Sequence, residues 1–118
     1  MKNTYILICA FLLTLLLFSC EKEELNEDYL WYRRAETGCA DPWDSYSGQS
    51  DSELSGAVKE YLNDRLIEYD KVVIGFDLNL AEVCLSCVCT TGRYIEVHAP
   101  NTHEEVLNEI GFFIVPNE

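Results

Sequence analysis

Three cysteines stand close together in the second half of the chain, in the pattern Cys84-x-x-Cys87-x-Cys89, and a fourth, Cys39, lies far upstream. Thiols in this pattern allow three kinds of chemistry: disulfide formation, metal binding by thiolates, and redox exchange. Which of these occurs depends on the compartment in which the chain folds, because only oxidising compartments favour disulfides.

The N-terminal segment indicates that the chain is exported. Residues 1–19 carry one charged side chain, Lys2, followed by an apolar run that only Thr14 interrupts, and then a small residue, Ser19. This is the layout of a secretory signal peptide. The apolar run is also shorter than the stretch of about 20 residues that a membrane-spanning helix needs.

The residues at the end of the signal peptide resemble the processing site of bacterial lipoproteins. Residues 17–20, Leu-Phe-Ser-Cys, resemble a lipobox, and residues 20–24, Cys-Glu-Lys-Glu-Glu, resemble the surface-export signal of Bacteroidetes lipoproteins. The resemblance implies cleavage before Cys20, acylation of that cysteine and a location on the outer face of the outer membrane, at the cell surface. Without it, the acidic run is simply a solvated tether.

The charge of the mature chain limits its partners. Removal of residues 1–19 takes away one basic side chain, Lys2, and leaves 7 basic against 21 acidic side chains. Phosphate backbones are bound by Lys and Arg, so nucleic acid is not an expected partner. We expect the lipid on Cys20 to provide the membrane contact, and the domain to meet an unknown protein or small ligand.

Three regions follow from these features. They are the signal peptide (1–19), the lipidated cysteine with an acidic tether (20–37), and a small domain (38–118). The tether contains an aromatic patch with Tyr29, Trp31 and Tyr32. Aromatic residues favour strands, so the patch is interpreted either as an added edge strand that packs on the domain or as a surface that contacts a partner.

A helix is expected to start at Ser50, which forms a capping box with Glu53. Apolar residues then recur at spacings of three and four, the period of an amphipathic helix; these are Leu54, Val58, Tyr61, Leu62, Leu66 and Tyr69. The far side of this helix carries the acidic residues Glu53, Glu60, Asp64 and Glu68. Such a stripe is either a solvated face or a surface for a cation or a basic partner.

Two strands are expected at 71–80 and 93–99, because apolar and polar residues alternate there. They are predicted to pair antiparallel, with the cysteine segment between them. The apolar side of the first strand, which is predicted to face the helix, consists of Ile74, Phe76, Leu78 and Leu80.

A short helix is expected after Pro100, capped by Asn101 with Glu104 or by Thr102 with Glu105, and ending at Gly111. A last strand is expected at 112–115. The predicted fold is therefore α+β: a small antiparallel or mixed sheet of three or four strands, with two helices on one face, stapled by disulfides.

Four cysteines remain after cleavage and lipidation. An even number in a small exported domain predicts two disulfides, and such a small core gains from cross-links. We expect Cys39 to be bonded into the cluster, and Cys84 to pair with either Cys87 or Cys89, since a bridge directly between Cys87 and Cys89 would be strained.

Two alternatives remain open for these cysteines. Together they are soft ligands for Zn or Cu(I), with His98 and His103 as further candidates, although structural zinc sites usually have two separate knuckles. Alternatively, Cys84 and Cys87 form a redox pair, although the residues that follow them do not have the pattern of the helix that activates such thiols.

Two short motifs, Cys39-x-Asp-Pro-Trp43 and Cys84-x-x-Cys-x-Cys-x-Thr-Gly-Arg93, resemble a group of small Bacteroidetes lipoproteins. The resemblance extends to residues 111–112, Gly-Phe, and implies no activity. We therefore expect a membrane-anchored, non-enzymatic binding or structural module without a cofactor. The alternative is a module of the cell envelope that binds Zn or Cu through thiolates or exchanges thiols.

Overall fold

The computed structural model describes residues 28–43 and 49–117, together with Asn3, Ile6, Ile8 and Ala10. Apart from those four positions, the predicted signal peptide lies outside the described residues, and so do Cys20 and the tether as far as residue 27. Within the described part of the chain, no helix is long and apolar enough to cross a membrane.

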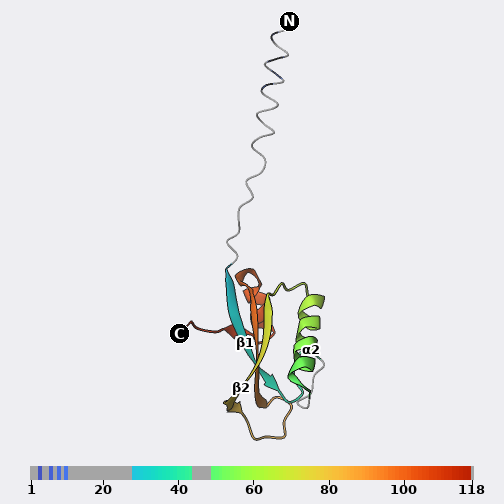
Figure 1. The fold of residues 1–118 in the computed structure, drawn as a ribbon, viewed down its shortest axis with the longest axis vertical. Helices are drawn as coiled ribbons and strands as arrows, with labels where there is room; N and C mark the ends of the chain where they lie inside the picture. Colours follow the sequence, from blue (N-terminus) through green and yellow to red (C-terminus); the bar gives the residue numbers. More distant parts are fainter. Residues whose placement is uncertain are drawn as a thin grey trace.

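The described residues form a four-stranded antiparallel sheet in the order β2-β3-β1-β4, with two helices and a short 3-10 turn (Figure 1). This confirms the predicted α+β fold class. The elements are β1 (Tyr29–Thr37), α2 (Asp51–Asp64), β2 (Lys71–Ala81), β3 (Thr90–Pro100), η1 (Asn101–His103), α3 (Glu104–Glu109) and β4 (Phe113–Ile114).

Strand β1 lies inside the sheet, between β3 and β4. It pairs with β3 from Tyr29, which lies opposite Pro100, to Thr37, which lies opposite Thr90. The prediction that residues 20–37 are a tether is therefore wrong from Tyr29 onward, and the domain begins there rather than at residue 38. The aromatic patch is an interior strand and not an added edge.

Both helices pack on the same face of the sheet, where the core lies. In β1 and β3, every second side chain points into this core, as strand geometry requires. The buried residues are Tyr32, Trp43, Leu54, Val58, Leu62, Ile67, Ile95, Val97, Ala99, Leu107 and Phe112. The other face of the sheet carries Trp31 and Arg33 of β1, opposite His98 and Glu96 of β3.

Helix α2 begins as predicted. The Ser50 side chain accepts a hydrogen bond from Glu53 N, and the Glu53 side chain accepts one from Ser50 N. The helix ends at Asp64, which is earlier than its apolar period suggested. Leu66 and Tyr69 therefore lie beyond the helix, in the turn that leads to β2.

Strand β2 faces the helices over only part of its length. Val72 and Ile74 pack against the core, whereas Phe76 and Leu78 are 63% and 75% exposed. The prediction that Phe76 and Leu78 face the helix is wrong, and Leu80 lies beside Arg33, on the other face of the sheet. Phe76 still pairs in register with β3, opposite Arg93, and the pairing becomes irregular only between Phe76 and Ala81. Both Phe76 and Leu78 lie beyond Ile74, the last residue of β2 that packs against the core.

The short helix after β3 begins differently from its prediction but ends at the predicted glycine. Neither predicted capping box forms, because the turn η1 comes first and α3 has no side-chain cap. Gly111 ends the helix with φ +88, and Gly111 N and Phe112 N donate to the carbonyls of Asn108 and Leu107. This is the glycine C-cap that was expected.

Candidate functional site

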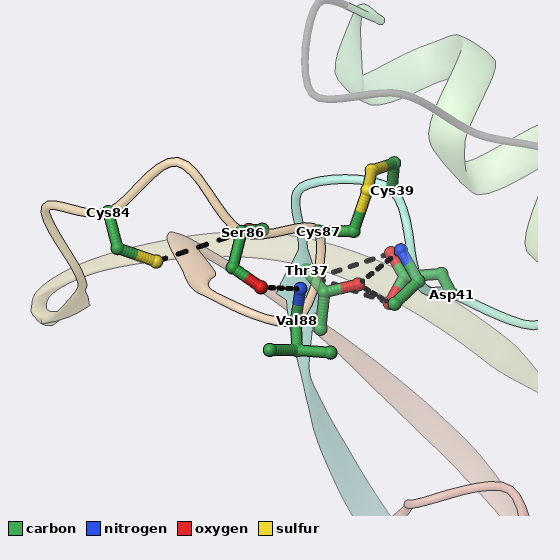
Figure 2. The surroundings of a disulfide bond; sticks show 8 residues. Thr37, Cys39, Asp41, Cys84, Ser86, Cys87 and Val88 are labelled. Carbon is green, nitrogen blue, oxygen red and sulfur yellow. Dashed lines mark hydrogen bonds between the residues drawn. A yellow bond between two sulfur atoms is a disulfide. The ribbon is translucent and has the colours of Figure 1, made fainter.

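Residues 82–89, here called the tip loop, join β2 to β3 at one end of the sheet (Figure 1). Two disulfides hold this loop, Cys39–Cys87 and Cys84–Cys89, with Cα–Cα distances of 4.6 and 6.3 Å. This confirms that Cys39 is bonded into the cluster and that Cys84 pairs with one of its two neighbours. Figure 2 shows the bond between Cys39, just after β1, and Cys87 of the loop.

Backbone hydrogen bonds add to the disulfides in fixing the tip loop. Gly38 N donates to Cys89 O at 3.0 Å, and Cys39 N donates to Cys87 O at 3.2 Å. At the base of the loop, Glu82 N donates to Thr90 O at 2.9 Å. The loop is therefore held by the chain on either side of it and also by the end of β1.

The apolar side chains of the tip loop point into solvent. Val83 and Leu85 are fully exposed, at 106% and 108%, and Val88 is 68% exposed. A single exposed aliphatic residue is ordinary, but a cluster on one rigid loop is typical of an interaction surface. These apolar residues were not predicted to contact a partner, because the cysteines on either side of them are the stronger signal in the sequence.

The Cys-x-Asp-Pro-Trp motif supports the base of this loop. The Asp41 carboxylate accepts hydrogen bonds from Thr37 N and Thr37 Oγ1 (Figure 2) and pairs with Arg34 at 3.0 Å. Burial raises the pKa of Asp41, against the hydrogen bonds from Thr37 and the charge of Arg34, which lower it. Trp43 is buried in the core, so this motif has a structural role.

The Thr-Gly-Arg motif has a structural role as well. Arg93 pairs with the buried Glu36, and Thr91 Oγ1 also donates to that carboxylate at 2.6 Å. Arg93 Nη1 donates to Gln49 O and Asp51 Oδ1, at the start of α2. The hydrogen bond to Glu36 is the main reason that the pKa of Arg93 is raised.

The predicted thiolate ligands are engaged in disulfides. Within the described residues, Glu82, Cys84 and Cys89 place possible ligand atoms within 4.8 Å of one another. Two of these atoms are the sulfurs of one disulfide, and a metal ligand must be a thiolate. The histidines lie elsewhere: His98 Nδ1 is 3.0 Å from Asp70 Oδ2, and His103 Nε2 accepts from Glu68 N.

The structure separates the three aromatic residues predicted to bind a partner. Tyr32 is fully buried. Tyr29 and Trp31 lie on the face of the sheet away from the helices, where their rings contact the ring of His98 at centroid distances of 5.3 and 4.8 Å. Only these two remain candidates for contact with a partner.

The four acidic residues of the predicted stripe, Glu53, Glu60, Asp64 and Glu68, are all exposed. Glu60 and Asp64 line a shallow depression with Trp43 and Tyr61, whereas Glu68 lies beyond the helix, beside another depression. The stripe is therefore divided and does not form a single acidic site. No family model, curated protein or solved structure matches the chain.

Proposed function

We propose that this chain is a lipoprotein anchored in the outer membrane by lipid on Cys20, and that it displays the tip loop to a protein partner. The observation that carries the proposal is the placement of the two ends of the sheet. β1 begins with Tyr29 at one end, directly after the tether, and the tip loop lies at the other end, beside Thr37 and Thr90. An anchor at Cys20 therefore leaves the tip loop on the far side of the domain.

The length of the sheet separates the loop from the anchor. β3 has 11 residues, and at a rise of about 3.3 Å per residue it spans roughly 35 Å. The tip loop is thus held about that far from the point at which the tether joins the domain. This distance favours contact with a molecule away from the anchoring membrane.

The shape of the tip loop favours a macromolecular partner. Sites for small molecules are concave and enclose the ligand, whereas Val83 and Leu85 project from the surface and enclose nothing. A partner must supply the apolar groove that receives them. Nucleic acid does not fit this description, because the loop contains no basic residue and the mature chain is strongly acidic.

Rigidity of the loop also favours binding over catalysis. Two disulfides fix the loop before any partner arrives, so little conformational entropy is lost when it binds. The alternative requires thiols: a thiolate metal site needs Cys84 and Cys89 reduced, and a redox module needs a disulfide that is reduced reversibly. Counting free thiols in the unreduced mature protein, together with metal analysis, separates the two functions: no free thiols and no metal supports the binding module.

Metabolic labelling with a fatty acid tests the anchor. We expect the mature chain to carry the label, the Cys20→Ala variant to lose it, and protease added to intact cells to digest the wild-type chain. An unlabelled wild-type chain would contradict the anchor, and protection from protease would contradict display at the surface.

Photo-crosslinking in the same cells tests the display of the tip loop. A photoreactive residue at position 85 should give one discrete protein adduct, and the same residue at position 59, an exposed position of α2, serves as the control. Equal adducts from both positions, or none from position 85, would contradict the proposed role of the loop.

A further inference from the structure

Leu66 has an unusual backbone conformation and an exposed side chain. Among the described residues, it is the only non-glycine residue with a positive φ, 58°. Its side chain is 85% exposed. A bulky residue in this left-handed region is strained, and burial of the side chain does not offset the strain here.

The end of α2 places Leu66 in this conformation. Leu66 N donates to Asn63 O, and Ile67 N donates back to Leu62 O. Position 66 is therefore the residue after the helix end, where glycine is the usual choice. A strained, exposed leucine in place of glycine is more typical of a functional position than of a structural one.

Leu66 lies at the end of the domain where the tether joins. It lines a shallow depression together with Tyr29, the first residue of β1, and with Asn63, Ile67, Glu68 and Tyr69. The eight residues 21–28 separate Cys20 from Tyr29, and a chain of this length reaches at most about 30 Å. A lipid on Cys20 therefore keeps this surface close to the bilayer.

We propose that the surface formed by Leu66, Tyr29 and Tyr69 rests on the lipid bilayer, with the Leu66 side chain among the lipid headgroups. This inference relies on the proposed anchoring through Cys20. Tyrosine suits such an interface, because its ring is apolar and its hydroxyl is polar. Contact at this end would point the tip loop away from the membrane.

The charge around Leu66 favours a zwitterionic lipid surface. Residues 63–71 contain three acidic and two basic side chains, which is nearly balanced in a chain that is otherwise strongly acidic. Arg65 and Lys71 are exposed and can reach lipid phosphates by extending their apolar stems. A strongly anionic membrane would repel the rest of the domain.

Tryptophan substitutions with brominated lipids test this contact. The acylated mature protein is reconstituted in phosphatidylcholine vesicles that carry bromine on the acyl chains near the headgroup, and quenching is compared with non-brominated vesicles. We expect Leu66→Trp to show at least about twofold more quenching than the wild type, whose Trp31 and Trp43 set the baseline. Leu85→Trp, in the tip loop, should not exceed that baseline.

A second tryptophan variant keeps the test decisive if Leu66→Trp fails to fold. Tyr69→Trp lies on the same surface and keeps an aromatic ring, so it should also be quenched; circular dichroism checks that each variant folds. Quenching of Leu66→Trp and Tyr69→Trp no greater than that of Leu85→Trp overturns the contact. Sedimentation of the Cys20→Ala chain without vesicles tests whether this surface is instead covered by a second copy of the chain. A dimer in which these reporters are buried overturns the lipid contact.

The two proposals fail in different ways in this experiment. Mass spectrometry of the mature chain reports acylation before any vesicle is added, so absence of the acyl mass refutes the anchor itself. Acylated protein with unquenched reporters refutes only the lipid contact of Leu66. Vesicles that contain phosphatidylglycerol should reduce the quenching, and stronger quenching there would overturn the preference for a zwitterionic surface.

Discussion

Glu36 and Arg93 form a two-pronged ion pair beneath the helices, with Arg93 Nε 2.9 Å from Glu36 Oε1 and Arg93 Nη2 2.6 Å from Glu36 Oε2. The Glu36 side chain is 1% exposed and that of Arg93 is 15% exposed. Through this pair, β1 and β3 are tied to the start of α2, because the same guanidinium also reaches Gln49 O.

Loss of one partner of this pair should destabilise the domain strongly. Arg93→Met keeps much of the apolar stem but leaves the Glu36 carboxylate buried without its cation, which typically costs about 3 to 5 kcal/mol. We expect this loss in the free energy of unfolding, measured by urea denaturation.

The matched control is Arg33→Met on the other face of the same sheet. Arg33 pairs with Glu96, but the Arg33 side chain is 40% exposed, and pairs in contact with water contribute about 1 kcal/mol or less. Equal losses in the two variants would show that the Glu36–Arg93 pair has no special role.

The two disulfides should differ in their contribution to stability. Cys39–Cys87 joins residues 48 positions apart, and Cys84–Cys89 joins residues 5 apart. The entropy of loop closure then predicts losses of about 4 kcal/mol for Cys39→Ser with Cys87→Ser, and about 2 kcal/mol for Cys84→Ser with Cys89→Ser. Denaturation of the two double variants measures this difference, and a larger loss from the shorter loop would reverse the order.

The Asp41 carboxyl should influence how stability changes with pH. Burial raises its pKa in the folded chain, so the folded state holds the proton more tightly than the unfolded state does. The contribution of Asp41 is therefore fully present below its unfolded pKa and is lost as pH rises through the folded pKa. The stability advantage of the wild type over Asp41→Asn should be larger near about pH 3 than near about pH 6.

Two measurements test the Asp41 prediction. Urea denaturation of both proteins across this range gives the difference in stability, and carbon NMR of the carboxyl gives the pKa directly. A stability difference that grows as pH rises would have the wrong sign.

Substitution of Leu66 by glycine should stabilise the domain. Glycine adopts a positive φ without strain, and relief of that strain, less the flexibility that glycine adds to the unfolded chain, predicts a gain of a few tenths to about 1 kcal/mol. Leu66→Ala is the control, because alanine also removes most of the leucine side chain but, unlike glycine, keeps the Cβ atom that causes the strain. If alanine stabilised as much as glycine in thermal unfolding, the backbone argument would be wrong.

The parts of the fold that depend on neighbouring residues could be predicted from the sequence. The capping box of Ser50 and Glu53, the antiparallel pairing of β2 and β3, and the cap at Gly111 each follow from local patterns. The same kind of local argument reduced the possible disulfide pairings, because the short spacing between Cys87 and Cys89 argues against a direct bond between them.

Strand β1 could not be recognised from the sequence because the residues that neutralise its buried charges lie outside the strand. Arg34 and Glu36 point toward the helices, and their partners Asp41 and Arg93 become neighbours only after folding. A run with several charges therefore resembled a tether. The exposure of Phe76 was missed because the apolar alternation of β2 continues past Ile74, the last residue of the strand that packs against the core.

Strand β1 and the Cys39–Cys87 bond together also define how the anchored chain would bear tension. With a lipid on Cys20, as proposed, the shortest covalent route from the anchor to the tip loop would run along residues 20–39 and cross to Cys87 through the disulfide. A partner that pulls on the loop would load this route, and neither α2 nor β2 lies on it. Under force, the helices could detach from the sheet and the partner would still be linked to the membrane through this route. Reduction of the Cys39–Cys87 bond would remove the route, and the noncovalent contacts of the domain would then bear the force.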